Sequence, residues 1–312
     1  MTLTELRYIV AVARERHFGR AAEACFVSQP TLSVAVRKLE EELGVVLFER
    51  SPGEVTVTPI GRRIVEQAQR VLEEAAAIAQ IALQGQDELS GMLRLGVIYT
   101  IGPYLLPHLI PLLRSRAPKM PLQIEENYTA VLSERLKQGE LDVIILSLPF
   151  DEPGILTEPV YEEPFVVVMP AGHPLEREPA IDAHALSHED LLLLGAGHCF
   201  RDQVLQVCPE CNRTSVSSDN MQKTLEGGSL ETIRLMVASG MGVTVLPQTS
   251  VNGYPYPREL LSIRPFREPV PKRTVALAWR KSFPRPKAIQ MLAEAVRACP
   301  LGEGVVMLEA GR

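Results

Sequence analysis

The spacing of apolar residues changes once along the chain, near Met92. Before this point the apolar residues recur at steps of three and four, which is the period of an α-helix. After it, short apolar runs of strand length alternate with helix-length segments, a pattern typical of a sheet covered by helices. A chain of 312 residues is also longer than a single core usually grows. The sequence therefore predicts a helical amino-terminal part and a separate α/β part.

The first 44 residues show the pattern of a helix-turn-helix. Helical spacing covers residues 1–20, and a second short helix is predicted over residues 20–24. Ser28 is a typical helix cap, and Pro30 suits the first turn of the helix that follows. The apolar face predicted for this third helix consists of Leu32, Val36, Leu39 and Leu43, and Gly44 ends it.

Two further features complete the helical part. Residues 45–48 and 55–58 are β-rich runs separated by a turn at 51–54, so we expect a wing beside the helix-turn-helix. A long helix is then predicted from Thr58-Pro59 to Gly85. Its apolar seam is Ile64, Ala68, Val71, Ala75, Ile78 and Ala82. A seam that regular over about 25 residues favours a partner helix and predicts a dimer.

The second part is predicted to be an α/β domain with parallel strands, built as two lobes. The expected strands are 93–98, 122–124, 142–146, 165–169, 243–246 and 274–278, and the expected helices are 104–113 and 229–239. We expect a winged helix-turn-helix at 1–58, a dimerisation helix at 59–88 and a regulatory domain at 89–312. Lobe I would hold residues 91–163 and 269–300, lobe II residues 164–268, and strands crossing between them would leave a cleft.

Composition limits the class of protein. The chain is 46% hydrophobic and 22% charged, as in soluble globular proteins. Its first residues mix charges into the apolar positions, so neither a signal peptide nor a membrane span is predicted, and we expect a cytoplasmic protein. The net charge of -6 gives no basic footprint for nucleic acid, and residues 1–60 hold seven Lys or Arg against eight Asp or Glu. Any DNA affinity must come from local placement of charge and from dimer avidity.

The candidate DNA contacts lie at the start of the third helix and on the wing. They are Ser28, Gln29, Pro30, Thr31, Ser33, Arg37 and, on the wing, Arg50. Gln29 can read adenine edges, and Arg37 suits a phosphate or a guanine. The alternative is a merely capped helix start followed by a solvated face. The neighbouring wing and dimer helix favour DNA binding.

Several motifs resemble the LysR-type transcription regulators. They are Phe18-Gly19-Arg20-Ala21-Ala22, Val27-Ser28-Gln29-Pro30-Thr31-Leu32-Ser33, Leu39-Glu40-Glu41-Glu42-Leu43-Gly44, Leu47-Phe48-Glu49-Arg50 and Thr58-Pro59-Ile60-Gly61. The similarity in the order of elements spans the whole chain. Within the family, Gly197-His198-Cys199-Phe200-Arg201-Asp202-Gln203 with Cys208 nine positions on is similar to the hydrogen-peroxide-sensing members.

This resemblance implies a function and an assembly. The protein would be a homotetramer, built as a dimer of dimers, that binds promoter DNA, contacts RNA polymerase and activates oxidative-stress genes. Its regulatory domain would resemble a periplasmic type II solute-binding fold. Neither enzymatic turnover nor a cofactor is expected, and the signal would be hydrogen peroxide.

The resemblance also assigns the thiols. Cys199 would be oxidised by peroxide and Cys208 would form a disulfide with it. It adds Thr100, Thr129 and Arg273 as residues that hold or activate peroxide. Asp202, three residues after Cys199, is a candidate for relaying a proton to or from the disulfide-forming step. His198 and Arg201 are close to Cys199 in sequence and are candidates for stabilising a thiolate. His198, Thr100 and Thr129 also suit purely structural roles, as a hydrogen-bonded histidine and as helix caps.

Spacing makes the pairing of Cys199 with Cys208 demanding. Phe200, Val204 and Val207 share a helical face, and a helix over this segment separates the two cysteine α-carbons by about 13 Å, whereas a disulfide needs roughly 4.4 to 6.8 Å. Disulfide formation must therefore remodel the segment. Cys211 departs from the family pattern and is a rival of Cys208 as the disulfide partner of Cys199.

Other interpretations remain open for the cysteines and for the protein. Five cysteines, an odd number, argue against a structural disulfide framework, and Cys25 and Cys299 suit packed positions. Cys208-Pro209-Glu210-Cys211 resembles half of a zinc site, but no second ligand pair follows it, so no metal is expected. The alternatives for function are a regulator that binds a small metabolite in the cleft, a thiol peroxidase and a secreted solute-binding protein. The wing and the dimer helix disfavour the second, and the lack of a signal peptide disfavours the third.

Overall fold

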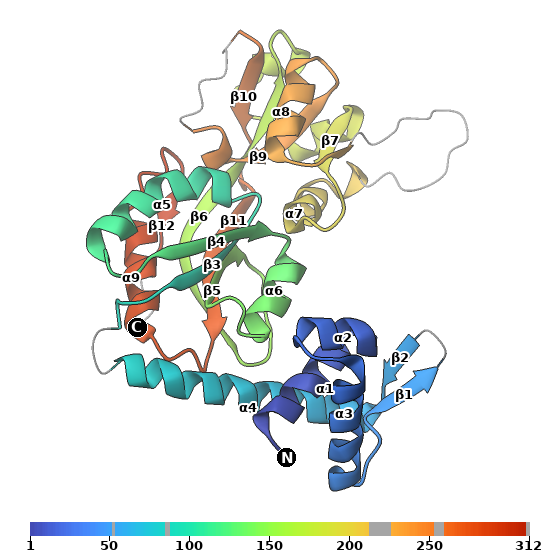
Figure 1. Cartoon of the computed structure of the whole chain (residues 1–312). Coiled ribbons are helices and arrows are strands. Elements are labelled where there is room, and N and C mark those ends of the chain that lie inside the picture. The colour runs from blue at the N-terminus through green and yellow to red at the C-terminus, as the bar shows by residue number, and fades with distance from the viewer. Residues whose placement is uncertain (52–53, 85–87, 212–225, 253–258, 310–312) are drawn as a thin grey trace. The chain divides into compact units, whose positions relative to one another are not determined.

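The protein folds into two compact units, Met1–Gln86 and Asp87–Arg312 (Figure 1). The computed structural model describes residues 1–51, 54–84, 88–211, 226–252 and 259–309. Among these residues no helix is both long enough and apolar enough to cross a bilayer. The two units are described separately below.

The first unit begins with the three predicted helices, which share one small core. They are α1 (Leu3–Glu15), α2 (Phe18–Ala24) and α3 (Gln29–Leu43). The side chain of Ser28 accepts a hydrogen bond from the N–H of Thr31 and so caps α3 as predicted. Leu32, Val36 and Leu39 are fully buried. Leu43 was expected on the same face but is 37% exposed, because α3 has by then passed the end of the core.

The wing strands have the predicted length but lie at other positions along the chain. Strand β1 (Phe48–Ser51) pairs antiparallel with β2 (Glu54–Val57), with Phe48 opposite Val57. The prediction of a strand from Val45 was wrong by three residues. The carboxylate of Glu40 accepts hydrogen bonds from the N–H groups of Leu47 and Phe48, which fixes this segment against α3 before the strand begins.

Helix α4 (Pro59–Gln84) confirms the predicted long helix, and its seam has two different environments. Ala68 is buried in the core of the first unit, and Ile64 packs against that core. Ile78, ten residues after Ala68, is 69% exposed. Ile64 and Ala68 thus serve the fold of this unit, whereas the exposed Val71 and Ile78 are left for another surface.

The second unit is built on ten strands in one curled sheet. These are β3 (Leu93–Ile98), β4 (Leu122–Asn127), β5 (Val143–Ser147), β6 (Ile155–Pro170), β7 (Leu191–Leu194), β8 (Glu226–Gly227), β9 (Val243–Pro247), β10 (Leu261–Pro265), β11 (Lys272–Arg280) and β12 (Val306–Met307). The order is β4-β3-β5-β11-β6-β9-β7-β8, and β10 and β12 also pair with β6.

The strand directions correct the expectation of a parallel sheet. β3 is parallel to β4 and β5, and β7 is parallel to β9, as the βα alternation indicated. However, β11 is antiparallel to both β5 and β6, and β6 is antiparallel to β9. The 16-residue β6 contributes residues to both hydrophobic cores, so it connects the two lobes of this unit. The long strand β11 pairs along β6.

Helices flank the strands of each lobe (Figure 1). In the first lobe α5 (Gly102–Arg116) and α9 (Pro286–Arg297) lie on one side of the strands and α6 (Thr129–Lys137) on the other. The second lobe contains α7 (Cys199–Val207) and α8 (Leu230–Ala238). Short 3-10 turns complete the unit, and they are η1 (Pro174–Arg177), η2 (Ala183–His188), η3 (Pro209–Cys211) and η4 (Gln248–Ser250).

Candidate functional site

Cys199 is the first residue of α7, where the helix begins after a sharp turn. Gly197 makes this turn with φ +97°, a conformation that other residues rarely adopt, and a Cβ there would come within 3.3 Å of the Tyr128 ring. The thiol of Cys199 is partly exposed and not disulfide-bonded. The thiol therefore lies at the end of α7 where the backbone N–H groups carry partial positive charge.

A small pocket adjoins Cys199. It is lined by Ile98, Tyr99, Thr100, Asn127, Tyr128, Thr129, Gly197, His198 and Cys199. Its free space suits about one water-sized molecule. The hydroxyl oxygen of Thr129 is buried and has no hydrogen-bond partner among the described residues. The structure therefore brings Cys199, Thr100 and Thr129 together as the sequence analysis predicted, and leaves one polar atom unpartnered.

Arg273 lies behind the pocket and holds Thr100. Its guanidinium donates to the Thr100 hydroxyl at 2.9 Å and to the Thr100 carbonyl at 2.8 Å. It also donates to Glu163 at 2.8 Å, and both side chains of this ion pair are completely buried. The guanidinium lies 5.3 Å from the ring centre of Phe200, the neighbour of Cys199. Arg273 is thus a positioning residue for Thr100 and for the first turn of α7.

His198 is part of the pocket wall. Its ring packs edge-on against Tyr128 and Tyr99, at centroid distances of 4.7 and 5.9 Å, and the residue is 6% exposed. Burial lowers the pKa of His198, and a backbone hydrogen bond with Gly228 only partly opposes this. A neutral imidazole supplies no positive charge to Cys199, so His198 shapes the pocket instead of acting as the cation suggested by the sequence.

Two charged neighbours on α7 are not brought into the pocket. Arg201 donates to the carbonyl of Leu194 and pairs with Glu226, both at 2.7 Å. Asp202 is exposed on the first turn of α7 and makes no hydrogen bond or ion pair with the residues that the structure describes.

Gln203 connects the two lobes, which the sequence analysis did not predict. Its amide nitrogen donates to the hydroxyl of Ser147 at 2.9 Å and to the carbonyl of Leu148 at 3.3 Å. The segment 197–203 had been noted for its resemblance, but nothing in its spacing revealed this contact. The sequence analysis also missed Tyr99, Asn127 and Tyr128, which line the pocket. Nothing in their spacing indicated that the ends of two strands meet beside Cys199.

Cys208 is bonded to Cys211, not to Cys199. Their α-carbons are 5.4 Å apart, whereas Cys199 and Cys208 stand at opposite ends of α7, about 13 Å apart by helical rise. The predicted helix between Cys199 and Cys208 is confirmed. Neither predicted partner of Cys199 is bonded to it; the two are bonded to each other, a pairing that the sequence analysis did not predict, because Cys211 is within reach of Cys208 while α7 is intact.

The remaining cysteines are placed for packing. Cys299 is buried and its thiol donates to the carbonyl of Ala295 at 3.2 Å; burial raises its pKa to about 11. Burial also raises the pKa of Cys25, which packs against the core of the first unit. Raised pKa values reduce the thiolate fraction, so neither thiol is suited to react with an oxidant.

The predicted DNA contacts gather at one end of α3. Ser28, Gln29, Pro30 and Thr31 are exposed there, Ser33 is partly buried, and Arg37 is exposed two turns further along. Arg50 belongs to β1, but its side chain lies outside the described residues. An exposed helix start that presents hydroxyl, amide and guanidinium groups can enter a major groove.

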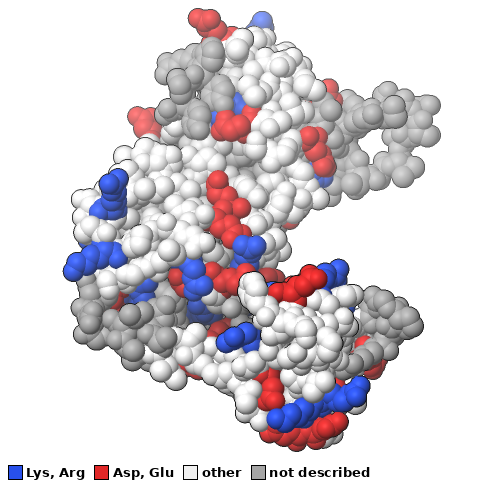
Figure 2. All heavy atoms as spheres, in the orientation of Figure 1, with Lys and Arg blue, Asp and Glu red and all other residues white. Residues whose placement is uncertain are grey.

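Charge over this unit is mixed. On the face drawn in Figure 2, blue and red side chains lie next to one another over the unit that contains α1–α4. Lys38 lies 3.7 Å from Glu5 of α1, and the carboxylate of Glu40 accepts hydrogen bonds from the N–H groups of Leu47 and Phe48. Near the carboxyl end of α3, Glu42 pairs with the amino terminus of Met1 at 2.7 Å, while Arg37 has no ion pair within the described residues.

Family models match both units. Residues 3–62 match the bacterial regulatory helix-turn-helix of the lysR family, and residues 86–299 match the LysR substrate binding domain. The chain is 39% identical over 298 residues to the DNA-binding transcriptional dual regulator OxyR of Escherichia coli, covering 96% of this chain and 95% of that protein. The chain belongs to the OxyR group of the LysR family.

Solved structures of this group agree with the fold. A full-length OxyR variant from Pseudomonas aeruginosa is 55% identical, covers 99% of both chains and superposes with a TM-score of 0.77. A reduced form of OxyR from N. meningitidis is 46% identical over 70% of this chain and all of that one, with a TM-score of 0.63. An H2O2-bound mutant of Corynebacterium glutamicum OxyR is 32% identical over 95% of this chain and 91% of that one, with a TM-score of 0.62.

Proposed function

We propose that the chain is a promoter-binding regulator that is switched by hydrogen peroxide at Cys199. The observation that carries the proposal is the pocket beside this thiol, in which the unpartnered Thr129 hydroxyl and the held Thr100 hydroxyl face a space for about one very small molecule. A metabolite of ordinary size does not fit there. Relatives named as hydrogen peroxide-inducible genes activators, and a solved relative with H2O2 bound, support the same signal.

The first chemical step takes place at the start of α7. The Cys199 thiolate attacks one oxygen of peroxide, the O–O bond breaks, and the sulfur becomes a sulfenic acid while the other oxygen leaves as hydroxide and takes up a proton to give water. Thr100 and Thr129 orient the peroxide by hydrogen bonds, and Arg273 keeps Thr100 in place. Asp202, on the exposed side of the same turn, relays a proton to water.

The second step transmits the signal. The Cys208 thiolate, once it is free of Cys211, attacks the sulfur of the Cys199 sulfenic acid; the disulfide forms, the S–O bond breaks, and hydroxide leaves and takes up a proton to give water. The new bond requires α7 to unwind, which releases Phe200 and Val204 from the core and breaks the contact of Gln203 with Ser147. The change in this segment then alters how regulatory domains associate.

The output is transcription of oxidative-stress genes. The exposed start of α3, with the wing and Arg50 beside it, contacts promoter DNA, and the exposed seam residues Val71 and Ile78 of α4 contribute to a dimer. We infer a dimer of dimers in the cytoplasm that contacts RNA polymerase. It reacts once with peroxide and does not consume it catalytically. The domain limits 1–58, 59–88 and 89–312 belong to the same proposal.

The test uses the full-length chain, fully reduced and then freed of reductant without air. One equivalent of peroxide is added, and a cyclic 1,3-diketone traps sulfenic acid for peptide mass spectrometry. We expect the adduct on Cys199 and its absence in Cys199→Ser, with Cys25→Ser behaving as the unaltered chain. A reporter that still responds to peroxide in Cys199→Ser would rule the proposal out. Sustained consumption of peroxide with a thiol reductant would indicate an enzyme instead.

A further inference from the structure

Cys208 and Cys211 form a disulfide directly after α7. Cys208 caps the helix, and Pro209–Cys211 forms the single 3-10 turn η3, in which the N–H of Cys211 donates to the carbonyl of Cys208 at 3.0 Å. The α-carbon distance of 5.4 Å lies within the range that suits a disulfide. This bond is therefore compatible with every turn of α7, including the one that carries Cys199.

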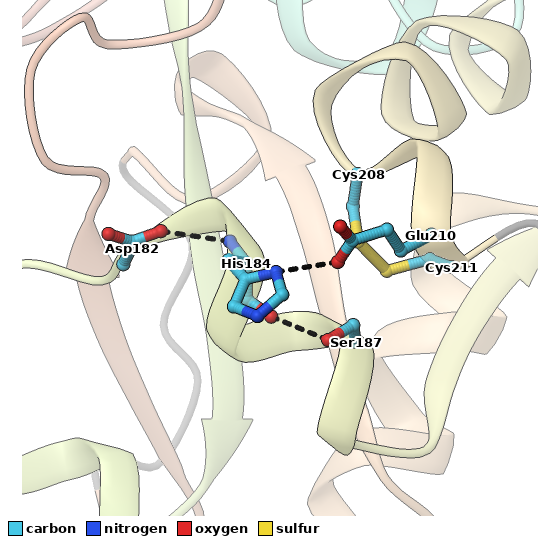
Figure 3. The surroundings of a disulfide bond; sticks show 6 residues. All are labelled: Asp182, His184, Ser187, Cys208, Glu210 and Cys211. Atoms are coloured by element: carbon cyan, nitrogen blue, oxygen red, sulfur yellow. Dashed lines mark hydrogen bonds and ion pairs between the residues drawn. A yellow bond between two sulfur atoms is a disulfide. The ribbon is translucent and has the colours of Figure 1, made fainter.

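The turn is fixed against a neighbouring element, as Figure 3 shows. Glu210, between the two cysteines, pairs with His184 of η2 at 2.6 Å. The η2 turn is itself held by Asp182, which accepts from the N–H of His184, and by Ser187, which donates to the carbonyl of His184. In the disulfide-bonded state these contacts place the turn that carries Cys211 beside η2.

The two sulfur-bearing residues differ in access. Cys208 is 3% exposed and belongs to the core of the second lobe, whereas Cys211 is only partly buried and packs at the edge of that core. A disulfide with one partly exposed end can be attacked by a dithiol from solution at that end. Cys211 is the end that a reductant reaches first.

We propose that Cys211 is an internal resetting thiol, which removes Cys208 from its disulfide with Cys199. This inference rests on the proposed function. The Cys211 thiolate attacks the Cys208 sulfur, the Cys208–Cys211 bond forms, the Cys199–Cys208 bond breaks, and Cys199 leaves as a thiolate. No external electrons are needed, because the two electrons that reduce Cys199 come from Cys211. A dithiol reductant of the cell later reduces Cys208–Cys211 and restores both thiols.

The packing of α7 gives this exchange its direction. A bond between Cys199 and Cys208 displaces Phe200, whose ring packs at 5.1 Å from that of Phe165, and also Val204, both of which are buried. After exchange to Cys211, both side chains can return to the core. Because both states contain one disulfide and differ in whether α7 is folded, we expect the equilibrium to favour Cys208–Cys211.

The consequence is a response that ends without an external reductant. Cys199 regains its thiol and its place beside the pocket, while Cys208 stays occupied by Cys211. A second peroxide molecule then oxidises Cys199 only as far as the sulfenic acid, because the resolving thiol is not available. The chain therefore cannot form the Cys199–Cys208 disulfide again until Cys208–Cys211 has been reduced.

The experiment follows disulfides in time in the full-length protein. Unaltered chain, Cys211→Ser and Cys199→Ser, each fully reduced, receive one equivalent of peroxide under anaerobic conditions, and acid-quenched samples are alkylated and mapped by mass spectrometry. In the unaltered chain we expect Cys199–Cys208 to rise and then decay with first-order kinetics, independent of protein concentration, as Cys208–Cys211 appears and Cys199 becomes alkylatable again. In Cys211→Ser we expect Cys199–Cys208 to last at least about tenfold longer. Cys25→Ser is the control and should match the unaltered chain.

The outcomes separate the two proposals. Equal lifetimes of Cys199–Cys208 in the unaltered chain and Cys211→Ser would overturn the resetting role and leave the proposed function standing. Formation of Cys208–Cys211 at the same rate in Cys199→Ser would also overturn it, because the bond would then arise without exchange. Absence of Cys199–Cys208 in both the unaltered chain and Cys211→Ser would overturn the proposed switch itself.

Discussion

Arg273 donates hydrogen bonds to both the hydroxyl and the backbone carbonyl of Thr100, a residue 173 positions earlier in the chain. The same guanidinium is paired with Glu163, and neither charged side chain is exposed. A buried ion pair of this kind costs desolvation, so its value lies in the geometry that it imposes on the pocket beside Cys199.

The buried pair gives a prediction for stability. Arg273→Met leaves the Glu163 carboxylate buried without its partner, so we expect the free energy of unfolding to fall by about 3 to 5 kcal/mol. Adding Glu163→Met should recover part of that loss, although the N–H of Thr249 then loses its acceptor. Urea unfolding of the full chain, analysed as a double-mutant cycle, measures both. A loss in the double variant equal to the sum of the two single losses would contradict the interpretation of Arg273 and Glu163 as a coupled pair.

Thr129 offers a direct test of the pocket. Its hydroxyl has no partner among the described residues, so Thr129→Val should change the stability of the chain little. If this hydroxyl orients peroxide, the valine variant oxidises Cys199 about threefold to tenfold more slowly, the value of one hydrogen bond. Stopped-flow measurement of thiol loss gives the rate. Thr129→Ser keeps the hydroxyl and should restore it; a valine variant as fast as the unaltered chain would exclude the role.

His198 predicts a dependence of stability on pH. Because burial lowers its pKa below the ordinary 6.5, the folded chain binds fewer protons at this residue than the unfolded chain. The stability that neutral His198 contributes is fully present above pH 6.5 and is lost as the pH falls below that value towards the lowered pKa. Thermal unfolding between about pH 5 and pH 8 should therefore show a shallower slope in His198→Gln. The exposed His108 serves as the control, and His108→Gln should keep the slope of the unaltered chain.

The thiols should differ in reactivity. Since the pKa of Cys299 is raised to about 11, we expect iodoacetamide at about pH 8 to modify Cys199 and leave Cys299 unmodified in the folded chain. Both should react after unfolding in urea. Peptide mass spectrometry measures the two extents, and comparable labelling of Cys299 in the folded chain would show that its burial does not protect it.

Arg37 predicts a change in DNA binding. Arg37→Ala should weaken binding to a duplex that the unaltered chain selects from a random-sequence pool. If Arg37 contacts phosphate, the salt dependence of binding should fall by about one released counterion for each bound α3. Fluorescence anisotropy at several salt concentrations measures the slope. Arg267→Ala, an exposed arginine of the second unit, is the control. An unchanged affinity in Arg37→Ala would place the DNA contact elsewhere.

Local patterns predicted most of the elements because their causes are local. The Ser28 cap, the apolar face of α3 and the long helix α4 follow from hydrogen bonds and side-chain spacing within a few turns. The same reasoning placed Leu43 in the core and began the first wing strand at Val45. Both were wrong because the end of a core and the start of a strand depend on side-chain contacts, such as that of the Glu40 carboxylate with the N–H of Leu47, which apolar spacing does not reveal.

By itself, the sequence determined the two-part organisation, the exposed start of α3 and the presence of three cysteines at the ends of α7. Only the tertiary structure decided which groups meet. It buried His198 so that it stays neutral, brought Arg273 to Thr100 across the sheet, and paired Cys208 with Cys211 while α7 kept Cys199 out of reach. The physical reason is that periodicity and capping act over a few residues, whereas burial, charge pairing and thiol proximity depend on where distant segments are packed.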